Sequence, residues 1–379
     1  MAKAQKIYLD HAAATPMHPD VLRAMQPFFS DNFYNPSANY SEATAARRSL
    51  DEARSKVAHW MGARNSEVIF TAGGSEANNL AIHGVMRKFP DANIVVSAIE
   101  HDSVLEAAKR YDCRLVSVDK DGRVDLEDLT KKIDQNTVLV SIAYANSEIG
   151  TVQSIRQIYR LLAEKRQLGK RKLPLYFHTD ACQAANYLDL HVSRLGVDLM
   201  TINGGKIYGP KQSGALFVKA GVVLQPLIDG GGQERGLRSG TQNVASSIGL
   251  ATALDIVQTA RHIETARLQN LQKAFFKQAH DKLPNVVVNG SQKWRLPNNV
   301  HLTFNGHDNE RLLIQLDQAG VLAAAGSACS ASDETPSHVL KAIGLTDSES
   351  QASLRFTMGR STTQAMIDKT IHTLRPLLK

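Results

Sequence analysis

The stretch Asn203-Gly204-Gly205-Lys206-Ile207-Tyr208-Gly209-Pro210-Lys211 follows a short apolar run, and so does the stretch His178-Thr179-Asp180-Ala181-Cys182-Gln183. Both runs predict buried strands, which places Lys206 and Asp180 at the carboxyl edge of a sheet, where open α/β sheets bind ligands. A lysine amine can form a Schiff base with an aldehyde, and an aspartate can keep a pyridinium nitrogen protonated. Pyridoxal phosphate needs both groups, so Lys206 is predicted to anchor this cofactor, with a solvated turn as the alternative.

Residues 67–218 alternate short β-branched runs with amphipathic stretches. This alternation predicts an α/β fold with a mainly parallel sheet, covered by helices on both faces. The expected strands are residues 67–70, 93–98, 114–118, 138–144, 175–179, 198–202 and 214–218, and the expected helices are residues 75–88, 103–111, 126–133 and 155–168.

The remainder of the chain predicts a long helix and a second, smaller unit. Residues 243–281 have apolar positions at helical spacing, so we expect one helix that leads out of the first domain. Beyond it, expected strands at 286–288, 300–304 and 353–357 and expected helices at 310–318 and 363–378 indicate an α+β unit. The predicted division is a large cofactor-binding domain of residues 15–257 and a small domain of residues 1–14 and 258–379, which carries Cys329.

The segment Thr71-Ala72-Gly73-Gly74-Ser75-Glu76 joins an expected strand to an expected helix. Paired glycines let the backbone approach an anion, and the Ser75 hydroxyl with the N–H groups of the first helical turn completes a cradle. Gly74 and Ser75 are therefore predicted to bind the cofactor phosphate. The alternative is a plain helix cap, but a position at the same sheet edge as Lys206 favours phosphate.

Four further segments carry reactive or anion-binding side chains. His101 follows an expected strand and can stack on a planar ring and relay protons, although a structural histidine is the alternative. The glycine-rich residues 230–241, ending at Thr241, predict a functional loop that meets an anion, with a mobile surface turn as the alternative. Cys329 lies among small residues, which suits an accessible nucleophile better than a buried structural cysteine. Arg355 can clamp a carboxylate, with a solvated strand arginine as the alternative.

Composition limits the kind of protein and its location. The chain has 379 residues and a net charge of +7, and no nucleic-acid-binding module accompanies this mild basicity. Three cysteines without metal-ligand spacing indicate a reducing cytoplasm, and we expect no metal. The amino terminus has no signal-peptide pattern and no apolar run is long enough for a membrane span, so we expect a cytoplasmic protein without membrane or nucleic-acid partners.

Together these segments resemble the cysteine desulfurases of pyridoxal-phosphate fold type I, in the class-V aminotransferase group. The resemblance runs nearly end to end, and its most specific pieces are GGGQERGLRSGT at 230–241, KIYGPK at 206–211, HTDACQ at 178–183 and GSACS at 326–330. The fold type implies a large α/β domain with a mainly parallel sheet and a smaller α+β domain. The context of Cys329 is similar to the subgroup with a long cysteine loop, which usually serves iron–sulfur cluster assembly and tRNA thiolation.

The resemblance implies a set of cofactor contacts. Lys206 would hold the aldehyde of pyridoxal 5'-phosphate, Asp180 its pyridine nitrogen, and Gln183 its phenolic oxygen. His101 would stack on the ring. The remaining contacts implied or expected at the cofactor are Gly74, Ser75, Ser147, Asn203 and Gly205, together with Thr241, which would reach the phosphate of the partner subunit in a homodimer.

The resemblance also implies the substrate, its binding residues and the reaction. Arg355, with Asn35, would bind L-cysteine. Lys206 would remove the α-proton, His101 would shuttle a proton, and Cys329 would receive the sulfur as a persulfide while L-alanine is released. The sulfur would then pass to an acceptor, either an iron–sulfur scaffold or a tRNA thiolation protein. The two other cysteines are expected to be structural, with Cys113 just ahead of a buried strand and the Cys182 side chain directed into the sheet.

The chain departs from the pattern of these relatives in three places. Asn203 and Gly205 stand where many relatives have the serine and histidine that donate to phosphate, and Ser147 replaces the second of two asparagines. We expect weaker cofactor binding, offset in part by the Asn203 amide and by closer approach of the backbone N–H groups of Gly204 and Gly205. The sequence also ends at Lys379 without the tail that docks a cluster scaffold in relatives.

Two alternatives to a cysteine desulfurase remain at this stage. One is another pyridoxal-phosphate enzyme of the same fold, such as a selenocysteine lyase or an aminotransferase. The other is a weakly active homologue that acts as a binding subunit. The altered residues 147, 203 and 205 are the support for this alternative.

Overall fold

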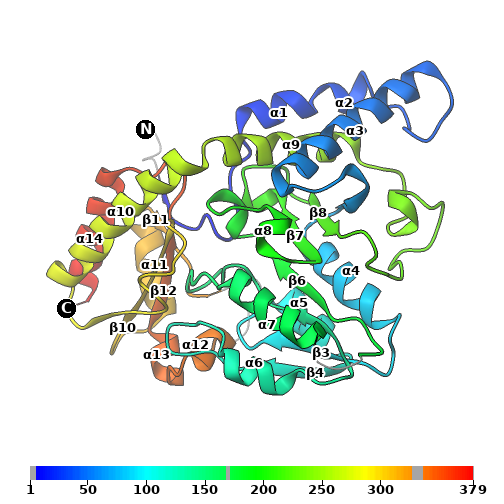
Figure 1. Cartoon of the computed structure of the whole chain (residues 1–379). Helices are drawn as coiled ribbons and strands as arrows, with labels where there is room; N and C mark the ends of the chain where they lie inside the picture. Colours follow the sequence, from blue (N-terminus) through cyan, green and yellow to red (C-terminus); the bar gives the residue numbers. More distant parts are fainter. Residues whose placement is uncertain (1–5, 168–170, 327–335, 379) are drawn as a thin grey trace.

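The computed structural model describes residues 6–167, 171–326 and 336–378, and within them a large twisted sheet lies beside a smaller one (Figure 1). The large sheet has the order β2-β8-β7-β6-β5-β3-β4. Its strands are β2 (Val68–Thr71), β3 (Asn93–Ser97), β4 (Asp112–Val116), β5 (Thr137–Ser141), β6 (Tyr176–Asp180), β7 (Leu199–Asn203) and β8 (Gly214–Val218).

Every strand of the large sheet except β8 runs in the same direction. The ladders from β7 through β6, β5 and β3 to β4 are parallel, whereas β8 is antiparallel to both of its neighbours, β7 and β2. The carboxyl ends of β2, β3, β5, β6 and β7 therefore meet at one edge. The predicted α/β fold with a mainly parallel sheet is confirmed.

Side chains alternate between the two faces of this sheet and enter two separate hydrophobic clusters. Val95 and Val140 belong to one cluster, whereas their neighbours Ile94 and Leu139 belong to the other. Because strand side chains alternate with a period of two, both faces of the central strands are apolar and both must be covered. Helices α4 (Gly74–Met86) and α5 (Asp102–Ala108) cover one face, and α3 (Ser41–Met61), α7 (Ile155–Gln167) and α9 (Val244–Thr259) cover the other.

Shorter elements complete the large domain. Helices α1 and α2 precede α3, and α6 and α8 connect strands. Their bounds, with those of the short 3₁₀ turns, are α1 (Pro19–Met25), α2 (Pro27–Ser30), α6 (Leu126–Lys132), α8 (Val192–Leu195), η1 (Asn65–Glu67), η2 (Ala184–Asn186), η3 (Gly204–Lys206) and η4 (Glu234–Gly236).

The single long helix expected over residues 243–281 is instead two helices, α9 and α10 (Arg261–Lys282). Ala260 between them has φ −84° and ψ −3°, a ψ that differs from that of a regular α-helix. The two helices have different packing partners, because α9 lies against α1 and α3 whereas α10 lies against α14 (Gln364–Leu377). The expectation of one helix was wrong because spacing of apolar residues does not show where a helix changes its partner.

The smaller unit is built on an antiparallel sheet in which β10 lies between β9 and β12. A short parallel pair of β1 and β11 joins the amino-terminal segment to it, and the Thr357 N–H donates to the Leu9 carbonyl at 2.7 Å. The elements are β1 (Ile7–Tyr8), β9 (Val286–Val288), β10 (Asn299–Phe304), β11 (Val321–Leu322), β12 (Ser353–Thr357), α11 (Asn309–Gln318), α12 (His338–Ala342) and α13 (Asp347–Gln351). The domain boundaries at residues 14/15 and 257/258 stay a prediction.

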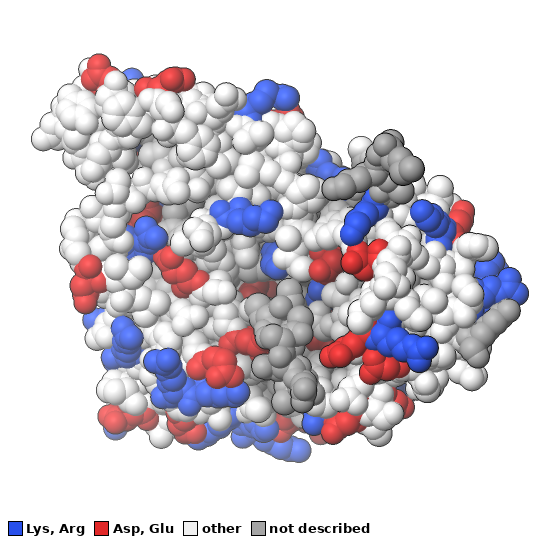
Figure 2. All heavy atoms as spheres, turned by 180° about the vertical axis from the view of Figure 1, so that it is seen from behind, with Lys and Arg blue, Asp and Glu red and all other residues white. Residues whose placement is uncertain are grey.

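A lobe with few charged side chains projects from the large domain. In Figure 2 it stands at the upper left, and in Figure 1 it contains α2 and the start of α3. Phe29, Phe33 and Tyr40 of this lobe are 60%, 66% and 50% exposed. Elsewhere on the face in Figure 2, acidic and basic side chains are interspersed. A cluster of exposed aromatic side chains is typical of a surface that another chain covers.

Candidate active site

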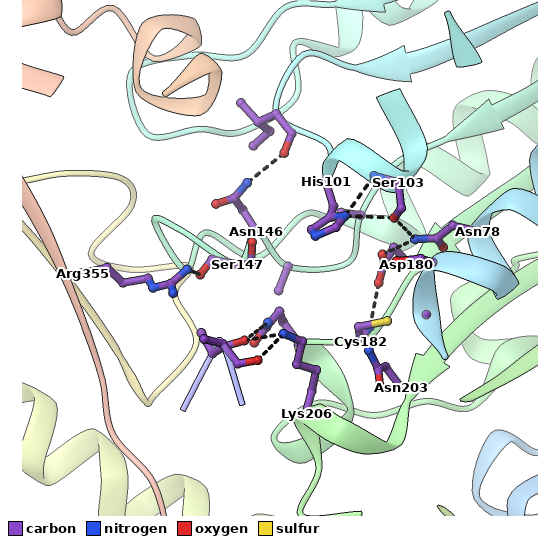
Figure 3. Close-up of a pocket in the computed structure, with 18 residues that line it drawn as sticks. Asn78, His101, Ser103, Asn146, Ser147, Asp180, Cys182, Asn203, Lys206 and Arg355 are labelled. Carbon is purple, nitrogen blue, oxygen red and sulfur yellow. Dashed lines mark hydrogen bonds between the residues drawn. The ribbon is translucent and has the colours of Figure 1, made fainter. Parts of the chain in front are cut away.

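A cavity of about 170 Å³ lies at the carboxyl edge of the large sheet, beside the smaller unit (Figure 3). It brings together most of the residues that the sequence predicted for the site. Those that line it are Gly74, Ser75, His101, Ser147, Asp180, Gln183, Asn203, Lys206 and Arg355. The structure therefore places side chains from both units around one space.

Lys206 enters this cavity from η3, directly after β7. Its Nζ donates to the carbonyl oxygens of Ala12 and Ala13, at 2.9 and 2.7 Å. An ammonium group has three donors, which suits a site lined by carbonyl oxygens. The amino-terminal segment thus holds the lysine amine inside the cavity, a contact that the sequence did not predict.

Asp180 ends β6 and is 9% exposed. Its Oδ2 accepts a 2.7 Å hydrogen bond from Asn78 Nδ2, and its Oδ1 accepts one of 2.8 Å from the Cys182 N–H. Asn78 also donates to Ser103 Oγ at 2.9 Å (Figure 3). These bonds fix the carboxyl group at the cavity wall, where it can pair with a protonated ring nitrogen. Asn78 was not among the site residues predicted from the sequence, although it lies one helical turn after Gly74 and therefore on the same face of α4.

His101 caps the amino terminus of α5. Its Nδ1 accepts a 3.0 Å hydrogen bond from the Ser103 N–H and lies 2.9 Å from Ser103 Oγ. A neutral imidazole that accepts at Nδ1 carries its proton on Nε2, and this assignment follows from the hydrogen bonds. Since His101 lines the cavity, its Nε2 proton is the one available there.

The start of α4 forms a concave backbone surface beside the cavity. The first N–H groups of a helix have no partner within the helix and attract anions. A Cβ atom at Gly74 would lie 2.8 Å from Cys182 Sγ and 3.3 Å from the Asn203 side chain, so no larger residue fits there. This cradle, with Ser75 beside it, suits a phosphate group.

Asn203 and Gly205 are arranged differently from the expectation. Asn203 Oδ1 accepts the Gly205 N–H at 3.0 Å, and the Gly204 N–H donates to the Ser213 carbonyl at 2.8 Å. We expected these two N–H groups to approach the phosphate. This expectation was wrong, because each of them donates to an oxygen of the protein instead. The Asn203 Nδ2 group lies 3.3 Å from the Cβ position of Gly74, so this amide is the donor that faces the cradle.

Arg355 on β12 is 1% exposed, which excludes the solvated arginine considered as the alternative. Its guanidinium donates to the Ser147 carbonyl at 3.1 Å and to Asp10 Oδ1 at 2.8 Å. A planar guanidinium held in this way at a cavity wall is suited to a carboxylate. Ser147 contributes its carbonyl to this contact (Figure 3).

Other predicted residues lie elsewhere. Gly205 does not line the cavity, and Thr241 lines a separate hollow with Gly214 and Arg238. Asn35 is exposed, and its Oδ1 accepts the Ser37 N–H at 2.9 Å. Within the described residues, neither Asn35 nor Thr241 reaches the cavity of its own chain. Cys329 lies outside the described residues.

The two other cysteines do not lie where the sequence placed them. Cys182 lines the cavity and is directed at Gly74 rather than into the sheet, and burial raises the pKa of its thiol well above the ordinary value. Cys113 lies within β4, an edge strand, rather than before a buried strand. Burial raises the pKa of the Cys113 thiol as well. The position of Cys182 was wrong because neighbouring residues do not show the direction of a side chain at a strand end, and that of Cys113 because β4 begins at Asp112, two residues before the expected start.

Gln183 also lines the cavity, and its Nε2 donates to the Ala12 carbonyl at 3.0 Å.

No helix in the described ranges is both long and apolar enough to cross a lipid bilayer. The same ranges contain no group of three or more His, Cys, Asp or Glu side chains placed to hold a metal ion.

Comparisons with known proteins agree with this geometry. The family model described as Aminotransferase class-V matches residues 7–370. Cysteine desulfurase IscS of Dictyoglomus turgidum is 38% identical over 382 residues, which cover 99% of this chain and 95% of that protein. Cysteine desulfurase IscS 1 of Archaeoglobus fulgidus is 38% identical over 374 residues, covering 97% and 95%.

Solved structures show the same relationship. The structure of a NifS-like protein has a TM-score of 0.91 and 29% identity, covering 99% of both chains. A second structure, of SspA in complex with cysteine, has a TM-score of 0.80 and 34% identity, covering 93% of this chain and 98% of that one. The chain therefore belongs to the aminotransferase class-V family, in the branch of the cysteine desulfurases. The resemblance inferred from the sequence motifs is confirmed, and so is the fold type I architecture.

Proposed function

We propose that this chain is a pyridoxal-phosphate-dependent cysteine desulfurase, which converts L-cysteine to L-alanine and receives the sulfur on Cys329. One observation carries the proposal, because a single cavity is lined by Lys206, Asp180 and Arg355. An amine, a stabilised carboxylate and a guanidinium are the groups needed for the aldehyde, the ring nitrogen and the substrate carboxylate. The 38% identity to proteins named cysteine desulfurase supports the same reaction.

The residues present fit the cofactor. Lys206 would hold its aldehyde, Asp180 its ring nitrogen, and the amino terminus of α4 its phosphate, where glycine leaves room that a Cβ would fill. His101 and Gln183 line the same cavity and would contact the ring and its phenolic oxygen. When bound, pyridoxal phosphate supplies an electron sink that stabilises negative charge at the amino acid's Cα.

Each protein group then has a defined task. Arg355 binds the substrate carboxylate, which directs the α-proton toward the Lys206 amine, and Lys206 takes that proton. His101 moves a proton at Nε2. The Cys329 thiolate forms a bond to the substrate sulfur as the Cβ–S bond breaks, and the electron pair of that bond remains with the carbon. Cβ takes up a proton, Lys206 returns a proton to Cα, and the product leaves as alanine, while Cys329 becomes a persulfide.

Cysteine as the substrate has support from one relative, because the similar protein SspA has been solved in complex with cysteine. The context of Cys329 suits onward transfer of sulfur to a protein acceptor, either an iron–sulfur scaffold or a tRNA thiolation protein. We place the enzyme in the cytoplasm, because three cysteines without a pairing pattern favour a reducing compartment.

We further propose that the enzyme is a homodimer in which Thr241 reaches the partner's cofactor phosphate. Thr241 faces a hollow away from the cavity of its own chain, and the lobe of α2 and α3 exposes Phe29, Phe33 and Tyr40. Sedimentation of the cofactor-loaded protein should give a dimer. A monomer that binds the cofactor and turns over cysteine would contradict this.

The decisive experiment is to incubate the protein with cysteine and a thiol reductant and to measure sulfide and alanine together. Equal amounts are expected. Cys329→Ser should retain the visible absorbance of the cofactor and stop release of both products, whereas the matched control Cys113→Ser should turn over normally. Lys206→Ala should lose the absorbance.

The alternatives give different results. A selenocysteine lyase would release alanine from selenocysteine but not from cysteine, and an aminotransferase would form a keto acid. A homologue that acts only as a binding subunit would show no cofactor absorbance that is lost when Lys206 is replaced. Full activity of Cys329→Ser would remove Cys329 from the mechanism.

A further inference from the structure

Asp10 forms the one ion pair of the substrate arginine within the described residues. Its Oδ1 accepts a 2.8 Å hydrogen bond from Arg355 Nη2. The side chain of Arg355 is 2% exposed and that of Asp10 is 19% exposed, so salt and water screen this pair little. Arg355 lines the cavity, whereas Asp10 does not. Asp10 would therefore act on a substrate only through the arginine.

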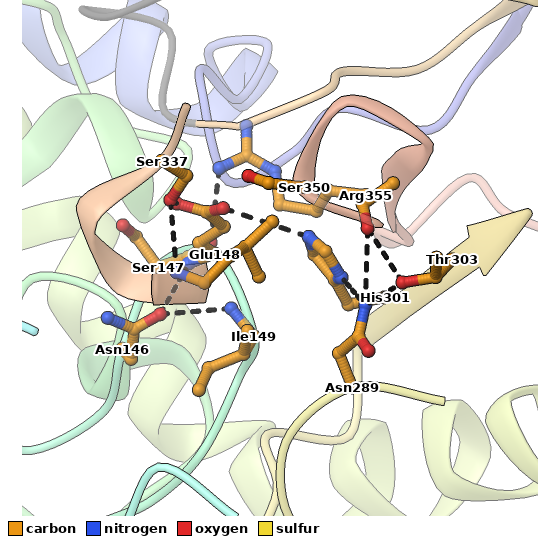
Figure 4. Close-up of polar contacts among 12 residues, drawn as sticks. Asn146, Ser147, Glu148, Ile149, Asn289, His301, Thr303, Ser337, Ser350 and Arg355 are labelled. Atoms are coloured by element: carbon orange, nitrogen blue, oxygen red, sulfur yellow. Dashed lines mark hydrogen bonds and ion pairs between the residues drawn. The ribbon is translucent and has the colours of Figure 1, made fainter. Parts of the chain in front are cut away.

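The other contact of the guanidinium is with backbone (Figure 4). Arg355 Nη1 donates to the Ser147 carbonyl at 3.1 Å. The turn that carries this carbonyl is fixed by Asn146, whose Oδ1 accepts two backbone N–H groups of the same turn at 2.8 and 2.9 Å. Each Nη atom of an arginine bears two hydrogens, so Asp10 and Ser147 leave one hydrogen on each for a substrate carboxylate.

Glu148 is a second carboxyl near Arg355, and it does not line the cavity (Figure 4). It is 2% exposed, and its Oε1 has no hydrogen-bond partner among the described residues. Burial raises the pKa of Glu148, while the Ser337 hydroxyl and the charge of Arg355 oppose this increase. A guanidinium released from Asp10 would thus have another carboxyl to pair with, one that lies outside the cavity wall.

The backbone around Asp10 is held independently of its carboxylate. Thr357 on β12 bonds to the residues on both sides of Asp10. Its N–H donates to the Leu9 carbonyl at 2.7 Å, and its carbonyl accepts the His11 N–H at 3.2 Å. The two carbonyls that bind Lys206 follow directly in the same segment. Loss of the Asp10 carboxylate should therefore change the position of the guanidinium and leave the contacts of Lys206 in place.

We propose that Asp10 is a positioning residue for substrate recognition, whose carboxylate holds the Arg355 guanidinium at the cavity wall and away from Glu148. The inference rests on the proposed function, in which Arg355 receives the carboxylate of cysteine. A two-pronged contact needs a guanidinium in a fixed plane, so a displaced Arg355 binds a carboxylate less well. Arg355 keeps a carboxyl partner with or without Asp10, and repulsion between that partner and the substrate therefore changes little.

The test measures two ligands that differ only in the carboxylate. L-Alanine is the proposed product, and ethylamine is alanine without its carboxylate. Binding of each ligand to the full-length, cofactor-loaded protein is followed by the change in cofactor absorbance, which needs no turnover. The variants are Asp10→Ala, Asp10→Asn, Arg355→Ala and the double variant of Asp10→Ala with Arg355→Ala. Asp317→Ala is the matched control, because Asp317 forms an exposed ion pair with Lys6, close to Asp10 in the sequence.

Asp10→Ala should raise the dissociation constant of alanine about tenfold, the loss expected for one hydrogen bond to a charged group. The dissociation constants of ethylamine and of the cofactor should stay within about twofold, and the KM for cysteine should rise as much as the constant for alanine. Asp10→Asn keeps an oxygen for Arg355 and should lose no more than about threefold. The double variant should bind alanine no more weakly than Arg355→Ala, because Asp10 acts only through the arginine. Asp317→Ala should match the wild type.

Equal weakening of alanine and ethylamine by Asp10→Ala would show a general disturbance of the site and overturn the proposal, and so would unchanged or tighter binding of alanine. If Asp10→Ala fails to fold, Asp10→Glu decides, because it keeps the ion pair but moves its oxygens by one methylene. It should weaken alanine and not ethylamine, and equal effects on the two refute the role. A wild-type protein that binds alanine but releases no sulfide from cysteine would refute the desulfurase function, and the affinity for alanine would still decide the role of Asp10.

Discussion

Asn78 Nδ2 lies 2.7 Å from Asp180 Oδ2 and 2.9 Å from Ser103 Oγ, so one amide joins α4 to β6 and to the cap of α5. Ser103 in turn bonds to His101 Nδ1. The aspartate and the histidine proposed to contact the cofactor ring are thus connected through the side chains of Asn78 and Ser103.

Asn78→Ala should weaken cofactor binding about ten- to a hundredfold, because Asp180 loses a hydrogen bond to its charged form. The dissociation constant of pyridoxal phosphate, measured by absorbance, checks this. Asn79→Ala is the matched control, since Asn79 bonds to the Ser75 carbonyl and not to Asp180. Equal affinity of the two variants would contradict the role of Asn78.

Gly205→His should tighten retention of the cofactor by about ten- to a hundredfold, because it adds a donor near the phosphate cradle. A Cβ at Gly205 would meet Asn203 Oδ1 at 3.4 Å and Lys211 Cγ at 3.6 Å, which are ordinary contacts. Gly205→Ala adds the Cβ without a donor and is the control. Dialysis followed by measurement of bound cofactor separates the two, and equal retention would show that Asn203 already suffices.

Glu100→Gln should become more stable relative to the wild type as pH rises from about 5.5 to 8. Burial raises the pKa of Glu100 from 4.5 to about 8, against a 2.8 Å hydrogen bond from the Ala143 N–H. The folded state therefore binds more protons than the unfolded state in this range, and the stability contributed by Glu100 falls by up to about 1.4 kcal/mol per pH unit. Glutamine has no such dependence.

Denaturant unfolding of the two proteins at several pH values measures this difference. Asp134→Asn is the control. Burial raises the pKa of Asp134, but hydrogen bonds from Asn93 and Arg114 outweigh it and lower the pKa to about 2, so its contribution is lost only in acid. A flat difference between Glu100→Gln and the wild type would show that Glu100 is ionised when folded.

Arg54→Ala should lower the free energy of unfolding by about 3–5 kcal/mol, because it leaves Glu234 buried without its partner. Both Arg54–Glu234 hydrogen bonds measure 2.7 Å, and Glu234 also accepts the Phe70 N–H at 2.8 Å. Glu234 and Arg235 have positive φ values of 45° and 59°, so the ion pair also holds a strained turn. Arg48→Ala, exposed on the same helix, should change stability by no more than about 0.5 kcal/mol. Similar values for the two would contradict this.

Much of the fold followed from the sequence because the central strands are apolar on both faces and alternate with amphipathic helices. Lys206, Asp180 and Gly74 were found because each directly follows a strand, and the parallel sheet brings these ends together. The reversal of β8 was not foreseen, since the period of apolar residues carries no information on strand direction.

Other features depend on contacts between distant segments and had no local signal. The carbonyls of Ala12 and Ala13 that bind Lys206 belong to backbone, which every residue has. Asn78 could have been found, because its helical spacing from Gly74 places it on the cavity face. The break at Ala260 could not have been predicted from the sequence, since it follows from the different packing partners of α9 and α10.

The hydrogen bond between Asp10 and Arg355 joins residues 345 positions apart, and it has a consequence for biosynthesis. Ribosomes deliver the chain from its amino terminus, so the segment that binds Lys206 emerges well before its partner strand β12. The large sheet is complete by Val218, long before β12 exists. A nascent chain that stops before β12 therefore has the strands of the cofactor edge but no arginine to receive a substrate carboxylate, and it becomes competent for amino acids only after β12 has been made.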